Sequence, residues 1–228
     1  MCGRYTHFFT WAELHWLLDH FTGLILPGEP AGEAYNFAPT QAGWVLTARD
    51  GPGSEAFDRL RWGLVPYWSK DAKIAYSTIN ARIESADSKP AFREAWKRRR
   101  CLVPASGYYE WKGEGAAKRP WFVRHEDAPV MMFGGLWERW KAPDGTPLET
   151  YSIVTMPAAG PIESLHDRMP LILPPELQPD WLHGTPQQAA ELALAAPEPS
   201  LRFHAVGKAV GNVRNQGPQL IVPDEAAA

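Results

Sequence analysis

Cys2, the second residue, carries the strongest chemical signal in the chain. Removal of Met1 leaves Cys2 with a free α-amine and a thiol on adjacent carbons. Such a 1,2-aminothiol condenses with an aldehyde to an imine, which the thiol then closes into a five-membered thiazolidine. Reference pKa values of about 7.7–8.0 for the amine and about 8.5 for the thiol let both groups react near neutral pH. An early cysteine is also compatible with a small buried apolar residue, so the remaining candidate residues must decide between the two interpretations.

Two side chains are candidates for moving protons. Glu110 lies among three aromatic residues in the segment 107–111. An apolar environment raises the pKa of a carboxyl group and suits it to a proton shuttle, although a salt bridge is the alternative. His166 lies in the segment 164–170, between opposite charges and ahead of a proline. Imidazole is the usual proton carrier near pH 7, whereas the alternative for a loop histidine is a structural role.

Other polar segments have residue types suited to a sugar–phosphate chain. Asn80 and Arg82 are two residues apart, so in an extended segment they face the same side. Arginine binds phosphate oxygens in a bidentate manner. Asn36 precedes a rigid turn at Pro39. The polar, glycine-containing segment 209–218 has no role that its residues define.

The segment 61–68 interleaves aromatic residues with glycine and proline. Flat rings of this kind stack on bases, at roughly 1–3 kcal/mol each in single-strand binding. The chain has 11 Trp, so most of them must belong to the core. We therefore predict that Trp62 is buried and that Trp68 is exposed for stacking.

The charge is distributed unevenly along the chain. The net charge of -3 does not by itself indicate nucleic-acid binding. Residues 61–100, however, hold ten Lys or Arg and four acidic residues, whereas the rest of the chain holds 13 basic and 22 acidic residues. One basic region on an acidic protein is compatible with a polyanionic partner. The basic run at 97–100 fits the solvated face of a helix equally well.

Composition limits the class of protein. A chain of 228 residues with 45% hydrophobic residues can bury one substantial core, as a single domain or two tight subdomains. It contains neither an apolar run of 18 residues nor a signal-peptide pattern, so we expect no membrane span and no export. Its two cysteines lack a Cys-x-x-Cys pair, which disfavours a disulfide framework or structural zinc. We therefore expect a cytoplasmic protein with no cofactor and no metal.

The pattern of elements predicts a β-rich α+β domain with mixed or antiparallel sheets and a few flanking helices. Helices are expected from the capping box at Thr10, from Ser88–Pro90 through Trp96, and from Thr185–Pro186 through Leu194. The predicted strands are 44–48, 101–103, 121–123, 130–133, 151–155 and 171–173. The predicted surface turns are 50–54, 112–119 and 142–147.

Seven short motifs occur in a fixed order and together resemble one family. They are Met-Cys-Gly-Arg, Asn-x-Ala-Pro, Trp-Gly-x-x-Pro-x-Trp, Ile-Asn-Ala-Arg-x-Glu, Gly-Tyr-Tyr-Glu-Trp, Leu-His-Asp-Arg-Met-Pro and Val-Gly-Asn-Val-Arg-Asn. This set resembles the SOS response-associated peptidase (SRAP) family of abasic-site processing proteins. The resemblance predicts one SRAP domain over residues 1–222 and a short tail at 223–228.

The resemblance implies a protein that traps abasic sites in single-stranded DNA as a stable covalent adduct. It makes Cys2 the nucleophile, formed by autocatalytic or aminopeptidase removal of Met1. The other implied roles are holding the abasic sugar and phosphate (Asn80, Arg82), moving protons (Glu110, His166), wedging or stacking beside the lesion (Pro39, Trp68) and further DNA contact (Arg4, Asn36, Arg168). We also expect a monomer that is nucleoid-associated if bacterial, with replication-fork proteins as candidate partners.

Two other functions fit part of the pattern. Glutamine amidotransferase domains also begin Met-Cys-Gly, which would make the protein an N-terminal-nucleophile amidohydrolase, but their downstream Asn-Gly and Asp signatures are missing here. Alternatively, the basic region and Trp68 could form a non-covalent single-strand-binding module. A DNA complex that survives boiling in denaturant separates the covalent function from this module.

Overall fold

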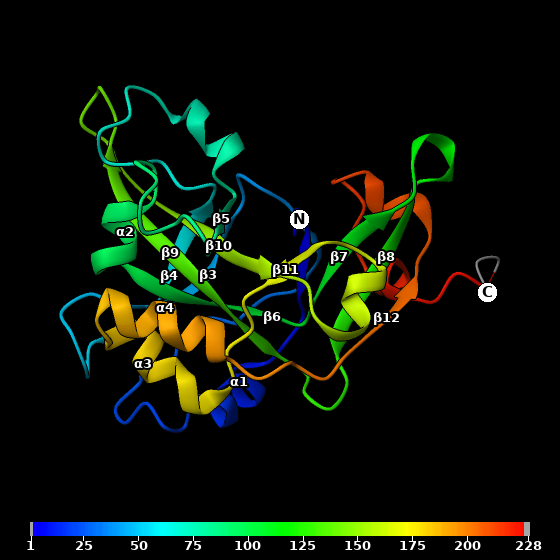
Figure 1. Cartoon of the computed structure of the whole chain (residues 1–228), viewed down its shortest axis with the longest axis horizontal. Helices are drawn as coiled ribbons and strands as arrows, with labels where there is room; N and C mark the ends of the chain where they lie inside the picture. Colours follow the sequence, from blue (N-terminus) through cyan, green and yellow to red (C-terminus); the bar gives the residue numbers. More distant parts are fainter. Residues whose placement is uncertain (1, 226–228) are drawn as a thin grey trace.

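A computed structural model describes residues 2–225 as two neighbouring sheets with helices packed at one end (Figure 1). The first sheet is antiparallel, with strand order β12-β8-β7-β1-β2. Its strands are β1 (Tyr5–His7), β2 (Ala34–Phe37), β7 (Gly107–Lys112), β8 (Arg119–His125) and β12 (Leu201–Ala205). In Figure 1, β7, β8 and β12 form the right-hand part of the molecule.

The second sheet is mixed and nearly closed on itself. Its order is β11-β10-β4-β3-β6-β9, and β9 pairs with β10 as well, so five strands complete a ring. The short strand β5 adds to β10 in parallel, as does β4. The strands are β3 (Ala42–Ala48), β4 (Glu55–Trp62), β5 (Asn80–Arg82), β6 (Arg100–Ala105), β9 (Met131–Lys141), β10 (Pro147–Pro157) and β11 (Arg168–Pro170). These two sheets confirm the predicted α+β class.

The helices are short. The α-helices are α1 (Trp11–Leu17), α2 (Arg93–Arg98), α3 (Gln178–His183) and α4 (Pro186–Ala195). The 3₁₀ segments are η1 (Ala72–Ser77), η2 (Gly115–Ala117), η3 (Gly160–Ser164), η4 (Pro175–Leu177), η5 (Lys208–Gly211) and η6 (Pro218–Ile221). The capping boxes at Thr10 and Thr185 begin α1 and α4. Among the described residues, none of the helices has the length and apolar character that crossing a bilayer requires.

Two predicted elements differ from the structure. The second helix was expected to start at Ser88–Pro90, but it begins at Arg93. The preceding residues form successive turns whose hydrogen bonds end on the carbonyls of Ser85 and Lys89, and Pro90 has no N–H to join them into one helix. Residues 171–173 make only an isolated bridge, and the adjacent strand β11 lies at Arg168–Pro170.

A hydrophobic cluster between the two sheets fixes the position of the N-terminal segment. It contains Cys2 and Tyr5 from the first sheet's side, together with Trp62 and Tyr151 from the second sheet. Trp62 is fully buried, as predicted. A second, larger cluster packs the α-helices against the ring of strands. Cys2 therefore lies at the junction of the sheets and not in a surface loop.

Candidate active site

The residues around Cys2 come from both sheets. Cys2 is fully buried just before β1, and its main-chain carbonyl accepts a hydrogen bond of 2.8 Å from Nδ2 of Asn80 on β5. Strand β5 is held by its pairing with β10. Contacts with both sheets thus fix the segment that carries Cys2. The carbonyl oxygen of the Asn80 amide is buried and has no hydrogen-bond partner among residues 2–225.

The thiol of Cys2 lies in an apolar and aromatic environment. Burial and then the charge of Glu110 raise its pKa well above the ordinary value, so at neutral pH it is held as the protonated thiol. The cluster around it includes Tyr5, Tyr108 and Tyr151, all fully buried. The hydroxyls of Tyr5 and Tyr151 lie 2.7 Å apart. The thiol therefore needs a nearby group to accept its proton before it can act as a nucleophile.

Glu110 and His166 supply groups of the required type. Glu110 lies on β7 and is only 2% exposed, and burial raises the pKa of its carboxyl group, an effect opposed by the charge of His166 among others. His166 follows η3; its Nε2 lies 3.9 Å from Oε2 of Glu110, and its side chain is 24% exposed. On the other side of the ring, Nδ1 lies 2.9 Å from the main-chain nitrogen of Arg168 and 2.7 Å from Asp167 Oδ1. One buried acid and one partly exposed imidazole thus meet beside Cys2.

Two of the predicted DNA contacts, Arg82 and Trp68, are exposed. Arg82 is exposed and shares β5 with Asn80, with the buried Ala81 between them. Trp68 is 49% exposed, as the sequence predicts. Its indole N–H donates to the carbonyl of Pro90 at 3.3 Å, which fixes the orientation of the ring. An exposed guanidinium and an oriented indole are suited to a phosphate and a base.

The turn at Pro39 is held tightly against the second sheet. Pro39 is half-buried, and the residue after it, Thr40, has a positive φ of 77°. That conformation costs a non-glycine residue about 1–3 kcal/mol, so other contacts must impose it. The main-chain N–H of Thr40 donates to the carbonyl of Trp62 at 2.9 Å. The strained turn places Pro39 in a defined position at the end of β4.

Asn36, an expected DNA contact, has a different position from the one predicted. It lies within β2, is fully buried, and donates from Nδ2 to the carbonyls of Val210, Asn212 and Asn215 at 2.9–3.1 Å. Its carbonyl oxygen accepts from Arg4. The amide of Asn36 thus makes its hydrogen bonds with the C-terminal segment and with Arg4, and its role in DNA contact stays a prediction.

Arg4 and Arg168, two further expected contacts, are also engaged within the protein. Arg4 donates to Val210 O at 3.0 Å in addition to Asn36, and its guanidinium carbon lies 5.8 Å from the ring centre of Trp111. Arg168 is 8% exposed and makes a two-pronged ion pair with Glu84. Its buried guanidinium holds β11 to the segment after β5. Arg168 thus positions the segment around β11, and its contact with DNA stays a prediction.

The basic run at 97–100 does not form one surface. Lys97 and Arg98 are exposed on α2. Arg99 pairs with the buried Glu138 at 2.7 Å, and Arg100 is buried and donates to main-chain carbonyls, including that of Trp96. Only part of the basic region can reach a polyanion. The sequence does not reveal which of the four side chains are exposed, because this depends on where α2 ends and β6 begins.

Sequence reasoning missed two features of the site. The three buried tyrosines around Cys2 (Tyr5, Tyr108 and Tyr151) come from three strands that are far apart in the sequence, so only the fold brings them together. The hydrogen bonds between the Asn36 amide and main-chain carbonyls of segment 209–218 were also not predicted. In residues 2–225, no three His, Cys, Asp or Glu side chains are arranged to hold a metal ion.

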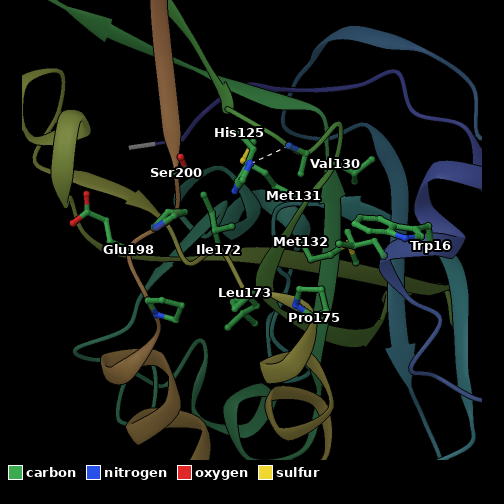
Figure 2. Close-up of a pocket in the computed structure, with 15 residues that line it drawn as sticks. Trp16, His125, Val130, Met131, Met132, Ile172, Leu173, Pro175, Glu198 and Ser200 are labelled. Carbon is green, nitrogen blue, oxygen red and sulfur yellow. Dashed lines mark hydrogen bonds between the residues drawn. The ribbon is translucent and has the colours of Figure 1, made fainter.

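A separate apolar cavity of about 290 Å³ lies away from these residues (Figure 2). Trp16 of α1, Met131 and Met132 of β9, and Ile172 and Leu173 line it. None of the predicted site residues contributes to its wall. The apolar cavity is therefore separate from the predicted site residues.

Comparisons with known proteins identify the family of the chain. The family model described as SOS response associated peptidase (SRAP) matches residues 1–213. The abasic site processing protein YoqW of Bacillus subtilis is 35% identical over 226 residues, covering 97% of this chain and 99% of that protein. The abasic site processing protein YedK of Escherichia coli is 34% identical over 233 residues, covering 98% and 100%.

Solved structures show the same fold. A crystal structure of a protein from Bacteroides thetaiotaomicron has a TM-score of 0.78 and covers 98% of this chain and 100% of that chain, at 23% identity. A phage-related protein from Bordetella bronchiseptica has a TM-score of 0.69 and covers 90% and 94%, at 29% identity. The division into one domain over residues 1–222 and a short tail at 223–228 stays a prediction.

Proposed function

Because this chain belongs to the SOS response associated peptidase (SRAP) family, we propose that it recognises abasic sites in single-stranded DNA and traps them covalently through Cys2. The names of its relatives support abasic-site processing. The observation that carries the covalent step is the position of Cys2, clamped by Asn80 and lying beside the Glu110–His166 pair. A non-covalent DNA-binding module would have no need for a buried thiol at this position.

The proposed reaction joins an abasic sugar to the N-terminal residue. The ring-opened deoxyribose exposes an aldehyde at C1′. The α-amine of Cys2, freed by removal of Met1, adds to this carbon, and loss of one water gives an imine. The thiol sulfur then adds to the same carbon as its proton moves to the imine nitrogen, which closes the thiazolidine. Ring closure consumes the imine, through which β-elimination would otherwise break the strand.

Glu110 and His166 divide the proton transfers of this sequence. Glu110 removes a proton as the amine attacks and returns one to the departing water, since its buried carboxyl group has a raised pKa. It also lies near enough to the thiol to influence its titration, and it can accept the thiol proton during ring closure. His166, which is more exposed, protonates the sugar oxygen and favours the open aldehyde.

Removal of Met1 is the step that creates the nucleophile. Met1 lies outside the described residues. We propose that Glu110 assists its removal in an autopeptidase reaction; a cellular aminopeptidase would give the same product, since Cys2 is small. Mass spectrometry of purified wild-type protein and of Glu110→Gln separates the two routes. Retention of Met1 only in the variant supports the autocatalytic route, and complete removal in both overturns it.

The test of the proposed function uses a uracil-containing single-stranded oligonucleotide. The protein is incubated with it, with and without prior treatment by uracil glycosylase, and the products are boiled and separated on a denaturing gel. A shifted band only after glycosylase treatment supports covalent trapping of abasic sites. A complex that forms in native gels but disappears on boiling overturns the covalent step.

A further inference from the structure

Residues 209–216, hereafter the C-terminal loop, are held in place by hydrogen bonds from buried polar side chains. Asn36 donates to three carbonyls of this loop, and Arg4 donates to one of the same three, that of Val210. The side chain of Gln216 accepts from the main-chain N–H of Tyr35 at 3.0 Å and donates to Asn36 O at 3.3 Å. Such a number of specific contacts gives the loop one defined conformation.

These contacts also orient the peptide groups of the loop. The carbonyls of Val210, Asn212 and Asn215 point inward to Asn36, and the carbonyl of Ala209 accepts from Nδ2 of Asn215 at 2.8 Å. Carbonyl oxygens are the negative ends of the peptide dipoles. The three carbonyl oxygens that bond to Asn36 are engaged within the protein, so they do not oppose an anion at the outer surface of the loop.

The outer surface of the loop is exposed and has a basic residue at its tip. Val213 is 46% exposed, and Arg214 is exposed and makes no ion pair within the part of the chain that the structure describes. Segment 208–223 contains no Asp or Glu, although the whole chain carries a net charge of -3. An acid-free segment with a free guanidinium and a neighbouring apolar side chain suits a phosphate next to a sugar or base.

The loop lies directly beside the segment that carries the nucleophile. Arg4, which contacts the loop, is two residues from Cys2, which contacts Asn80. Two residues of extended chain span about 7 Å, so the contact of Arg4 with the loop and the contact of Cys2 with Asn80 belong to the same short segment. In Figure 1, strand β5 lies in the left-hand part of the molecule and the orange-red segment that follows β12 lies in the right-hand part.

We propose that the C-terminal loop forms a second DNA-contacting surface, in which Arg214 binds a backbone phosphate and Val213 packs against the adjacent nucleotide. This surface lies across Cys2 from Arg82, so the two arginines hold the strand on opposite sides of the abasic nucleotide. The inference rests on the proposed function, since it assumes that single-stranded DNA lies over Cys2. It gives the otherwise unassigned segment 209–218 a role in substrate binding.

The test measures binding without chemistry. Fluorescence anisotropy is recorded with a single-stranded oligonucleotide that carries a tetrahydrofuran abasic analogue, which has no aldehyde and cannot be crosslinked. The variants are Arg214→Ala, Arg214→Lys and Arg82→Ala. The matched control is Arg202→Ala, which removes an exposed arginine from β12 at the opposite edge of the first sheet from β2. Circular dichroism confirms that each variant is folded.

We expect Arg214→Ala to weaken binding several-fold and to reduce the slope of log affinity against log salt by about 0.7, the value for one single-strand phosphate contact. Arg214→Lys should restore most of the affinity, and Arg202→Ala should match wild type. If Arg214→Ala keeps the wild-type affinity and slope while Arg82→Ala loses both, the loop proposal is overturned and the proposed function stands. If all four variants bind like wild type and the aldehyde substrate gives no adduct, the proposed function itself has failed.

Discussion

The imidazole Nε2 of His166 lies 3.9 Å from Oε2 of Glu110, and the two groups have very different environments. Glu110 is almost completely buried on β7, whereas His166 retains contact with solvent. Burial favours the protonated carboxyl group, and the neighbouring imidazole favours its ionised form. A buried carboxyl group with a raised pKa beside an imidazole supplies an acid and a base of different environments, as acid–base catalysis requires.

In protein from which Met1 has been removed, Glu110→Gln should slow adduct formation by roughly 10²–10⁴, the usual contribution of general acid–base catalysis. The amide keeps the shape of the side chain and removes the titratable group. Single-turnover formation of the adduct across pH 5 to 9 measures the effect. Binding of intact single-stranded DNA should be nearly unchanged. A variant that matches wild type at every pH would make this carboxylate purely structural.

Glu110 should also make the stability of the protein depend on pH. Burial raises its pKa in the folded state above the unfolded value of about 4.3, so the folded state binds this proton more tightly. The contribution of Glu110 to the free energy of unfolding is therefore most favourable below about pH 4.3, and it is lost as pH rises through the folded-state pKa. Thermal unfolding of wild type and Glu110→Gln should show the variant gaining relative stability as pH increases. A constant difference between the two melting temperatures would contradict the shift.

His166→Ala should slow adduct formation by a smaller factor, up to roughly 10², because its proposed task is to favour the open aldehyde. The loss should therefore shrink on a substrate whose sugar is already ring-opened. Parallel single-turnover reactions with a native abasic site and with a simple aldehyde-bearing oligonucleotide make the comparison. Equal slowing on both substrates would assign His166 to the imine or ring-closure step instead.

Arg82 and Arg168 should respond differently to substitution by alanine. Arg82 is exposed, so Arg82→Ala should weaken DNA binding at any base sequence, with a salt slope lower by about 0.7 and little change in stability. Arg168 is buried and paired with the partly exposed Glu84, so Arg168→Ala should lower the free energy of unfolding by about 1 kcal/mol or more. Anisotropy titrations and urea unfolding of both variants check this. An equal reduction of the salt slope in both variants would show that both arginines reach phosphate, and a wild-type slope for Arg82→Ala would show that Arg82 does not.

The local signals in the sequence predict the elements that depend on local rules. The capping boxes at Thr10 and Thr185 begin helices where expected, and the burial of Trp62 and the exposure of Trp68 are both confirmed. Short-range hydrogen bonds and turn chemistry determine these features. The predicted start of α2 was wrong. Ser88 resembles a helix cap, but a series of turns separates it from the helix.

The chemistry of single residues could be predicted, but their partners could not. Cys2, Glu110 and His166 are separated by more than fifty residues, and only the pairing of β1 with β7 and the course of the segment after η3 bring them together. Asn36 and Arg168 look like ligand-binding groups in the sequence because an unpaired amide or guanidinium has no evident partner. The fold supplies those partners from the C-terminal loop and from Glu84.

The most direct measurement of the central claim is the formation of a heat-stable adduct by Cys2. Wild type, Cys2→Ala and a variant with a non-cleavable tag before Cys2 are incubated with abasic single-stranded DNA and examined on a denaturing gel, with peptide mapping of any shifted band. We expect an adduct at Cys2 in wild type only, because the other two proteins lack the thiol or the free α-amine. A full-strength adduct from Cys2→Ala or from the tagged protein would contradict the thiazolidine mechanism.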